Sequence, residues 1–163
     1  MSARLAKQVG KTLKSHGVML ATAESCTGGG IAQAITRVSG SSAWFDRGFI
    51  TYSNISKQEM LGVSPETLEK HGAVSEVTVR EMADGALQFS SAQVALAVSG
   101  IAGPTGGTPQ KPVGTVWFAW ASGRTVNTAC HQLSGDRDAI RVKAVRIALQ
   151  GVLDLMKSQT EIA

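Results

Sequence analysis

One segment near the start of the chain gives the strongest indication of its fold. Residues 18–23 form a largely apolar run of strand length, residues 24–30 are polar and rich in glycine, and residues 31–38 repeat apolar side chains at helical spacing. A buried strand followed by a polar turn and a helix is typical of the ligand-binding edge of an α/β sheet. The segment therefore predicts an α/β fold with a candidate site at the turn.

The rest of the chain alternates between helical and strand patterns. Helices between buried strands, with a short hairpin at residues 122–124, predict a three-layer α/β/α sandwich with a mixed sheet. Residues 1–163 are expected to form a single domain, because the chain has no linker and no repeat. The predicted helices are 3–16, 31–38, 54–61, 65–71, 76–87 and 136–156, and the predicted strands are 18–23, 44–53, 94–98, 116–121 and 125–133.

Composition excludes several classes of protein. The 163 residues are 43% hydrophobic and only 17% charged, which argues against disorder. No apolar run approaches the roughly 18 residues of a membrane-spanning helix, and residues 1–16 are too polar for a signal peptide. Cys26 and Cys130 are too few for a disulfide framework. We therefore expect a reduced, cytoplasmic protein with no membrane partner.

The net charge of +4 raises the question of nucleic-acid binding. The basic residues are scattered, however, and the densest group, between Arg137 and Arg146, alternates with apolar residues on one predicted helix. Aromatic residues make up 5% of the chain, too few for a base-stacking surface. We expect no nucleic-acid partner, and a surface that attracts a small anionic ligand accounts for the charge as well.

The polar turn at residues 24–30 offers candidate nucleophiles. Ser25, Cys26 and Thr27 lie just before a predicted helix, where exposed N–H groups can hold a phosphate or an oxyanion. The alternative interpretation is structural, with a Ser or Thr cap for the helix and glycines for the turn.

A serine nucleophile needs a base, and the three histidines are poorly placed to provide one. His16 and His71 lie at predicted helix ends, and His131 lies within a predicted strand. A second polar loop carries Tyr52 and Lys57. Lysine can serve as a base when burial or neighbouring cations lower its pKa. Most single lysines are solvated surface groups, so spacing alone does not select Lys57.

A third polar segment spans residues 99–114. It has neither a Walker pattern nor the spacing of a dinucleotide-binding loop, and it is either a proline-stiffened surface loop or a functional one. Arg137 and Arg141, four residues apart on the last predicted helix, could bind a phosphate together or form a solvated basic face. No cluster of Asp, Glu or His has the spacing of a metal site, so no metal is expected.

Several motifs in this order resemble the CinA C-terminal domain family and cover nearly the whole chain. The length corresponds to its stand-alone form, which lacks an extra N-terminal domain. Ser99 stands where the family commonly has threonine, and Ile55-Ser56 stands where many members have a Glu-Ala pair. The matching motifs are AESCTGG (residues 23–29), GSSAWF (40–45), YSN (52–54) with Lys57, HGAVS (71–75), SGIAGP (99–104), KPVGTV (111–116) and GDR (135–137).

The resemblance implies a nicotinamide-nucleotide amidohydrolase, which converts nicotinamide mononucleotide to nicotinate mononucleotide and ammonia without a metal or cofactor. Ser25 would be the nucleophile and Lys57 its base, with Tyr52 beside them. The expected partner is the small-molecule substrate, and a homo-oligomer is possible. The residues implied in substrate binding are Cys26, Thr27 and Gly28 through backbone N–H groups; Ser99, Gly100 and Gly103 in the third segment; and Arg137 or Arg141 at the 5′-phosphate, where these cations would also lower the pKa of Lys57.

Two alternatives remain open at this level. The chain could be a catalytically weak or inactive regulatory paralogue that binds pyridine nucleotides without releasing ammonia. It could also be a transferase or hydrolase that uses Cys26, since a thiol at the start of a helix can have a lowered pKa.

Overall fold

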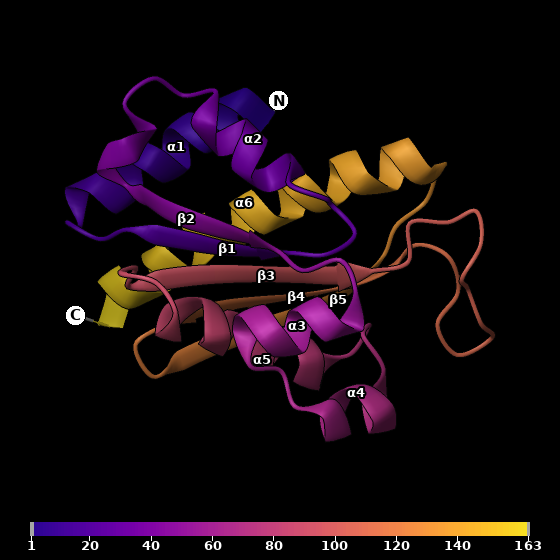
Figure 1. Cartoon of the computed structure of the whole chain (residues 1–163). Coiled ribbons are helices and arrows are strands. Elements are labelled where there is room, and N and C mark those ends of the chain that lie inside the picture. The colour runs from indigo at the N-terminus through magenta and orange to yellow at the C-terminus, as the bar shows by residue number, and fades with distance from the viewer. Residues whose placement is uncertain (1, 163) are drawn as a thin grey trace.

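The computed structural model describes residues 2–162, and side chains through residue 159. These residues form a five-stranded mixed sheet with the strand order β2-β1-β3-β4-β5 and helices on both faces (Figure 1). β1 pairs in parallel with β2 and β3, while β3–β4 and β4–β5 are antiparallel. The strands are β1 (Leu20–Glu24), β2 (Phe45–Ile50), β3 (Val94–Gly100), β4 (Thr115–Ser122) and β5 (Thr125–Gln132). The helices are α1 (Ser2–Ser15), α2 (Gly30–Thr36), the 3₁₀ turn η1 (Ser41–Ala43), α3 (Asn54–Leu61), α4 (Pro65–His71), α5 (Glu76–Gln88) and α6 (Arg137–Ile162).

One face of the sheet is lined by alanine. Because successive side chains of a strand point to opposite faces, β1, β3 and β4 each present alternate alanines to the same side. Ala21 pairs with Ala95, which in turn pairs with Ala121, and a second row follows two residues along. These small side chains pack with the apolar residues of α5, including Val79 and Met82. α3, α4 and α5 form the layer that covers this face (Figure 1).

The opposite face carries the larger side chains and is covered by α1, α2 and α6 (Figure 1). Phe118 and Trp120 stack in parallel with ring centroids 5.7 Å apart. Trp120 Nε1 donates a 2.8 Å hydrogen bond to the carbonyl of Ala148. A Cβ atom at Gly151 would meet the Trp120 ring at 2.0 Å, so glycine permits this close approach. These contacts fix α6 against the sheet and thereby place its first turns beside the carboxyl ends of β1 and β3.

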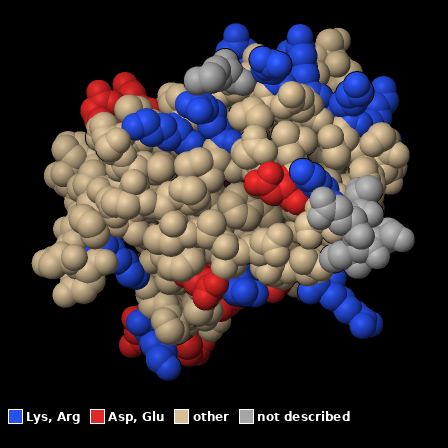
Figure 2. Space-filling model, turned by 180° about the vertical axis from the view of Figure 1, so that it is seen from behind, with Lys and Arg blue, Asp and Glu red and all other residues tan. Residues whose placement is uncertain are grey.

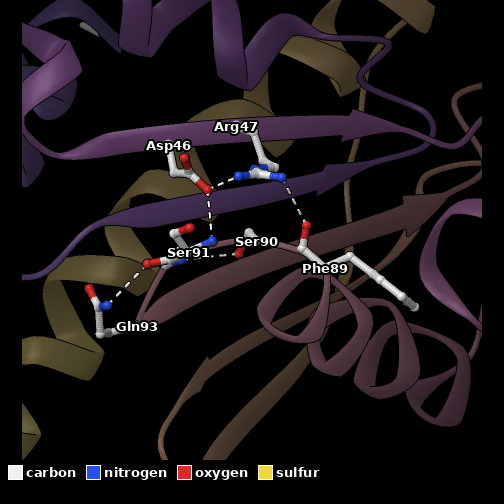
Figure 3. Close-up of polar contacts among 7 residues, drawn as sticks. Asp46, Arg47, Phe89, Ser90, Ser91 and Gln93 are labelled. Atoms are coloured by element: carbon white, nitrogen blue, oxygen red, sulfur yellow. Dashed lines mark hydrogen bonds and ion pairs between the residues drawn. The ribbon is translucent and has the colours of Figure 1, made fainter.

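The edge strand β2 is tied to the connection between α5 and β3 (Figure 3). The Asp46 carboxylate accepts hydrogen bonds from Arg47 Nε at 2.7 Å and from the N–H of Ser91 at 2.9 Å. Arg47 also donates to the carbonyl of Phe89 at 3.2 Å. The Ser91 contact holds the pKa of Asp46 below its usual range, with a smaller contribution from Arg47. This network anchors the amino-terminal end of β2.

α1 carries four basic side chains, Arg4, Lys7, Lys11 and Lys14, and no acidic residue. On the face seen in Figure 2, Lys and Arg lie mainly along the upper edge, the side on which Figure 1 shows the layer of α1 and α2. Within the described residues, no helix is both long and apolar enough to span a bilayer.

The three-layer fold and its mixed sheet are confirmed, with shifts at element ends. β1 starts at Leu20 instead of residue 18, because the N–H of Val18 bonds to Leu13 and closes the end of α1. The alternative interpretation of the turn, a Ser or Thr cap for α2, is wrong: the N-cap is Gly29, and no side chain caps the helix. α6 begins at Arg137, after Asp136 Oδ1 accepts from the N–H of Ala139, and runs beyond the predicted end at residue 156.

Candidate active site

The carboxyl ends of the three parallel strands meet at one edge of the sheet. Ser25 follows β1, Thr51 follows β2, and Ser99 lies near the end of β3. After β1 the chain crosses one face of the sheet through α2, and after β2 it returns over the other face through α5. β1 and β3 therefore flank the point where the connections change face, which is where open α/β sheets bind ligands.

Lys57 and Ser25 meet at this edge. Lys57 Nζ donates to Ser25 Oγ at 3.0 Å and to the backbone carbonyls of Thr51 and Tyr52 at 2.8 and 3.2 Å. The lysine lies on α3, whose N-cap Ser53 accepts a hydrogen bond from the N–H of Ser56. The side chain of Lys57 is buried, with only 1% of its surface exposed. All three protons of its ammonium form thus have an acceptor.

Burial lowers the pKa of Lys57 to about 8. The expected contribution of Arg137 and Arg141 to this shift is wrong: desolvation is the cause, and the other influence, from Cys26, acts in the opposite direction. A substantial fraction of Lys57 is therefore neutral just above neutral pH, and only the neutral amine can accept a proton.

Glu24 organises the turn that carries Ser25. Its buried carboxylate accepts hydrogen bonds from Thr27 Oγ1 at 2.6 Å and from the N–H groups of Ile31 and Ala32 at 2.9 and 3.0 Å. The carboxylate thus satisfies the free N–H groups at the start of α2, where negative charge is favourable. It also draws the turn against the helix.

The N–H groups of the turn differ in whether an oxygen atom accepts a hydrogen bond from them. Ser25 N–H bonds to the carbonyl of Val98, and Gly28 N–H bonds to the carbonyl of Ser25 at 3.0 Å. Gly28 is therefore not a free oxyanion donor, contrary to expectation. Among the described residues, no oxygen atom accepts a hydrogen bond from the N–H groups of Cys26 and Thr27. These two remain the candidate donors.

A cavity of about 250 Å³ opens beside the Ser25–Lys57 pair. Ser99 is almost fully buried at its wall, and Gly100 lies where a Cβ atom would meet Val116 Cγ2 at 2.6 Å. Gly103 has a φ of +78°, and a Cβ there would meet Val113 at 2.5 Å, so the third polar segment needs glycine at this position. The cavity is lined by Ser25, Cys26, Tyr52, Lys57, Ala73, Val74, Ser99, Gly100, Ala102 and Arg137.

Arg137 and Arg141 reach different loops. Arg137 is exposed, lines the cavity and donates to the carbonyl of Gly103 at 2.7 Å and to the Tyr52 hydroxyl at 3.3 Å. Arg141 instead donates from Nε to the carbonyl of Cys26 at 3.1 Å and from a terminal nitrogen to that of Thr27 at 3.3 Å. Arg141 lines a separate cavity between α1, α2 and α6.

The sequence comparison assigns the family. The model of the CinA C-terminal domain matches residues 2–156. The chain belongs to the CinA C-terminal domain family. It is 56% identical to the nicotinamide-nucleotide amidohydrolase PncC of Shigella flexneri, over 90% of each chain, and 58% identical to that of Enterobacter agglomerans, over 91% of this chain and 92% of the relative.

Solved structures of CinA proteins share the fold. The competence/damage inducible protein CihA from Agrobacterium tumefaciens is 47% identical, with a TM-score of 0.89 and 94% of each chain covered. A CinA superfamily protein from Klebsiella pneumoniae is 39% identical, with a TM-score of 0.94, and the match covers 97% of this chain and 99% of that one.

The structure argues against the alternative in which Cys26 is the nucleophile of this CinA-family site. Cys26 packs in the core, and burial raises the pKa of its thiol to about 11, so the lowered pKa that a cysteine nucleophile needs is absent. Tyr52 is 62% exposed, and its hydroxyl contacts Arg137 while its carbonyl contacts Lys57. Among the described residues, no three His, Cys, Asp or Glu side chains are grouped so that they could hold a metal ion.

Sequence reasoning missed the contribution of Glu24 and of two backbone carbonyls. Glu24 stands at the end of a predicted strand and shortly before a predicted helix, and an acidic residue near a helix start is a signal that could have identified it. The carbonyls of Thr51 and Tyr52, which hold Lys57, carry no side-chain signal. Ala73 and Val74 line the cavity from the segment between α4 and α5, which a sequence pattern alone does not bring to the site.

Proposed function

We propose that this chain is a nicotinamide-nucleotide amidohydrolase that converts nicotinamide mononucleotide to nicotinate mononucleotide and ammonia. The enzyme class, a hydrolase acting on an amide, agrees with the names of the two relatives described above. The observation that carries the proposal is the 3.0 Å contact between a buried lysine amine and a serine hydroxyl at the wall of a cavity. Such a pair supplies the nucleophile and the proton acceptor that amide hydrolysis requires.

Lys57 is held in an orientation suited to a base. In its neutral form, the amine has two N–H groups and one lone pair. The carbonyls of Thr51 and Tyr52 accept from the two N–H groups, which leaves the lone pair directed at Ser25 Oγ. Ser25 would then attack the carboxamide carbon as its proton passes to Lys57.

The remaining steps use the same groups. The N–H groups of Cys26 and Thr27 would stabilise the oxyanion of the tetrahedral intermediate. Lys57, now protonated, would return its proton to the departing nitrogen, so that ammonia leaves and an ester to Ser25 remains. Neutral Lys57 would then take a proton from the water that attacks the ester and pass it to Ser25 Oγ as the serine leaves. The carboxylic acid formed loses its proton to solvent and departs as the carboxylate.

Arg137 is the candidate contact for the 5′-phosphate. It is the arginine that lines the cavity with Ser25 and Lys57, whereas Arg141 is engaged with the turn carbonyls. The cavity is smaller than the roughly 300–1,000 Å³ of sites that enclose a drug-sized ligand. We therefore infer that it encloses the pyridine carboxamide, while the phosphate lies at the open, Arg137-bearing rim.

The direct test is ammonia release from nicotinamide mononucleotide by the wild type and by Ser25→Ala. We expect release by the wild type only, and no effect of EDTA, because every step is assigned to groups of this chain. Binding of the mononucleotide without ammonia release by the wild type would indicate a regulatory paralogue instead. Loss of the rate with EDTA and recovery with added zinc or magnesium would contradict the metal-free mechanism.

A further inference from the structure

The N–H groups of Cys26 and Thr27 each belong to a peptide unit whose carbonyl is held in place. Cys26 N–H shares its peptide with the Ser25 carbonyl, which accepts from Gly28 N–H at 3.0 Å. Thr27 N–H shares its peptide with the Cys26 carbonyl, which accepts from Arg141 Nε at 3.1 Å. The turn itself thus anchors one donor, and Arg141 anchors the other.

Peptide geometry makes this anchoring directional. Both peptides are trans, so the carbonyl and the N–H of each unit point in opposite directions within one plane. A carbonyl of Cys26 held toward Arg141 therefore turns the N–H of Thr27 away from the guanidinium. The positively charged guanidinium of Arg141, hydrogen-bonded to the carbonyl oxygen, also polarises the peptide, which makes the N–H of that peptide a stronger donor.

We propose that Arg141 is a positioning residue that orients and polarises the Thr27 N–H as an oxyanion donor. The inference rests on the proposed amidohydrolase function and assigns Arg141 a task different from phosphate binding. Its second bond, to the Thr27 carbonyl at 3.3 Å, holds the next peptide of the turn as well. Glu24 holds the same turn from the α2 side through Thr27 Oγ1, so the segment is fixed at both flanks.

The location of Arg141 supports a role in positioning the turn, distinct from the phosphate binding assigned to Arg137. It lies one helical turn after Arg137 on α6, yet it does not line the cavity of Ser25 and Lys57. It lines a separate cavity of about 350 Å³ together with Thr27 and Arg37. A Cβ atom at Gly28 would lie 3.3 Å from an Arg141 terminal nitrogen, so the guanidinium packs directly on the turn. Arg141 therefore holds the turn that carries Ser25 without lining the cavity of Ser25 and Lys57.

The kinetic test compares Arg141→Met with Arg137→Met on nicotinamide mononucleotide. We expect Arg141→Met to lower kcat by at least about tenfold, up to the roughly 10²-fold that removal of an oxyanion donor costs, with KM changed less than about threefold. The pH midpoint of the rate should stay unchanged, because Lys57 is untouched. Added guanidinium ion should restore part of the rate of Arg141→Met and none of the rate of Arg137→Met.

A rise in KM for the mononucleotide with kcat unchanged would overturn the inference and make Arg141 a phosphate ligand. Equal kcat in Arg141→Met and the wild type would overturn it too. The variant Arg141→Lys should recover part of kcat, because an ammonium can still bind one carbonyl.

A second measurement does not depend on substrate turnover. Amide hydrogen exchange at Gly28 and Gly30, whose N–H groups bond within the turn, should be about tenfold or more faster in Arg141→Met than in the wild type and in Arg137→Met. Unchanged exchange at these amides would show that Arg141 does not fix the turn. If the wild type releases no ammonia, the proposed function fails, and the exchange experiment still decides whether Arg141 holds the turn.

Discussion

Lys57 Nζ lies 3.0 Å from Ser25 Oγ, although 32 residues separate the two in the chain. The contact joins the turn after β1 to α3. The carbonyls of Thr51 and Tyr52 accept the other two hydrogen bonds of the Lys57 ammonium group. Because the lysine is buried and its pKa is lowered to about 8, this one contact connects nucleophile activation, pH dependence and stability.

Replacement of the two adjacent nucleophile candidates should have opposite effects. Ser25→Ala is expected to lower kcat by about 10⁴-fold or more, as the loss of a covalent nucleophile does. Cys26→Ala should retain most of the activity, since its thiol is buried and its pKa is raised to about 11. Ammonia release measured on both purified variants checks this. An inactive Cys26→Ala with a normal melting temperature would refute the serine assignment.

The rate should rise with pH through the pKa of Lys57. Neutral Lys57 is the reactive form, so kcat is expected to increase across a midpoint near about 8 and to level off above it. The measurement is a profile of kcat against pH, at saturating nicotinamide mononucleotide.

Lys57→Arg tests whether position 57 must lose a proton or need only carry a positive charge. A guanidinium keeps the positive charge but does not lose a proton in this range, so Lys57→Arg should be nearly as inactive as Lys57→Met. Both variants should still bind the mononucleotide by calorimetry. Substantial activity of Lys57→Arg with an unchanged pH profile would mean that another group takes the proton, and Tyr52 would be the first to test.

Lys57 should also make stability depend on pH. Its folded pKa of about 8 lies below the ordinary value of 10.5, so the unfolded chain binds more protons in this interval. The contribution of Lys57 to the free energy of unfolding therefore rises as pH increases from about 8 to about 10.4. We expect the wild type to gain stability over this range relative to Lys57→Met, by up to about 3 kcal/mol. Urea unfolding at several pH values tests this, and a constant difference would contradict a lowered pKa.

Arg137→Met should raise KM for nicotinamide mononucleotide more than it lowers kcat. A lost charge-assisted contact to the phosphate is worth roughly 1.5–3 kcal/mol, which corresponds to a rise in KM of about 10- to 100-fold. Nicotinamide riboside, which lacks the phosphate, should already be a poor substrate and should change little in the variant. Equal losses for the two substrates would indicate that Arg137 acts through its bonds to Gly103 and Tyr52 instead.

Glu24→Gln should reduce both stability and turnover. A glutamine offers one acceptor oxygen and places an NH₂ group among donors, so at least one hydrogen bond to Thr27, Ile31 or Ala32 is lost, at roughly 1.5–3 kcal/mol. kcat should fall as well, because the same carboxylate holds the turn of Ser25. Thermal unfolding and ammonia release measure the two effects.

Glu81→Gln is the matched control for that change. Glu81 accepts hydrogen bonds from the N–H of Ser64 and from Thr67 Oγ1 at the start of α4, away from the turn. The Glu81→Gln variant should have a lower melting temperature and a nearly unchanged kcat. A similar kcat loss in both variants would assign the effect of Glu24→Gln to global stability.

Local patterns in the sequence were sufficient for the layered fold. Strand patterns predicted the strands, and the predicted helices 65–71 and 76–87 match α4 and α5 to within one residue. These features depend on neighbours along the chain, which is why they can be read without a structure. They failed at β1, where Val18 bonds to α1, and at α2, where a carboxylate outside the helix replaces the side-chain cap.

Within the candidate site, the residue types along the chain establish which chemical groups are available. The turn at residues 24–30 held both a hydroxyl and a thiol, and the segment after β2 held a lysine. Resemblance to a family, and not spacing, singled out Ser25 and Lys57. The preference between Ser25 and Cys26 depends on burial, which raises the thiol pKa and lowers that of the lysine.

The folded structure establishes where those groups point and what they contact. It put Lys57 against two carbonyls that have no sequence signature, and it separated Arg137 at the cavity from Arg141 behind the turn, although both lie on one helix. Desolvation and contacts between distant segments arise only when α3, α6 and the turn pack at one edge of the sheet. A pKa or a hydrogen-bond partner is a property of that packing, whereas a residue type is a property of the chain.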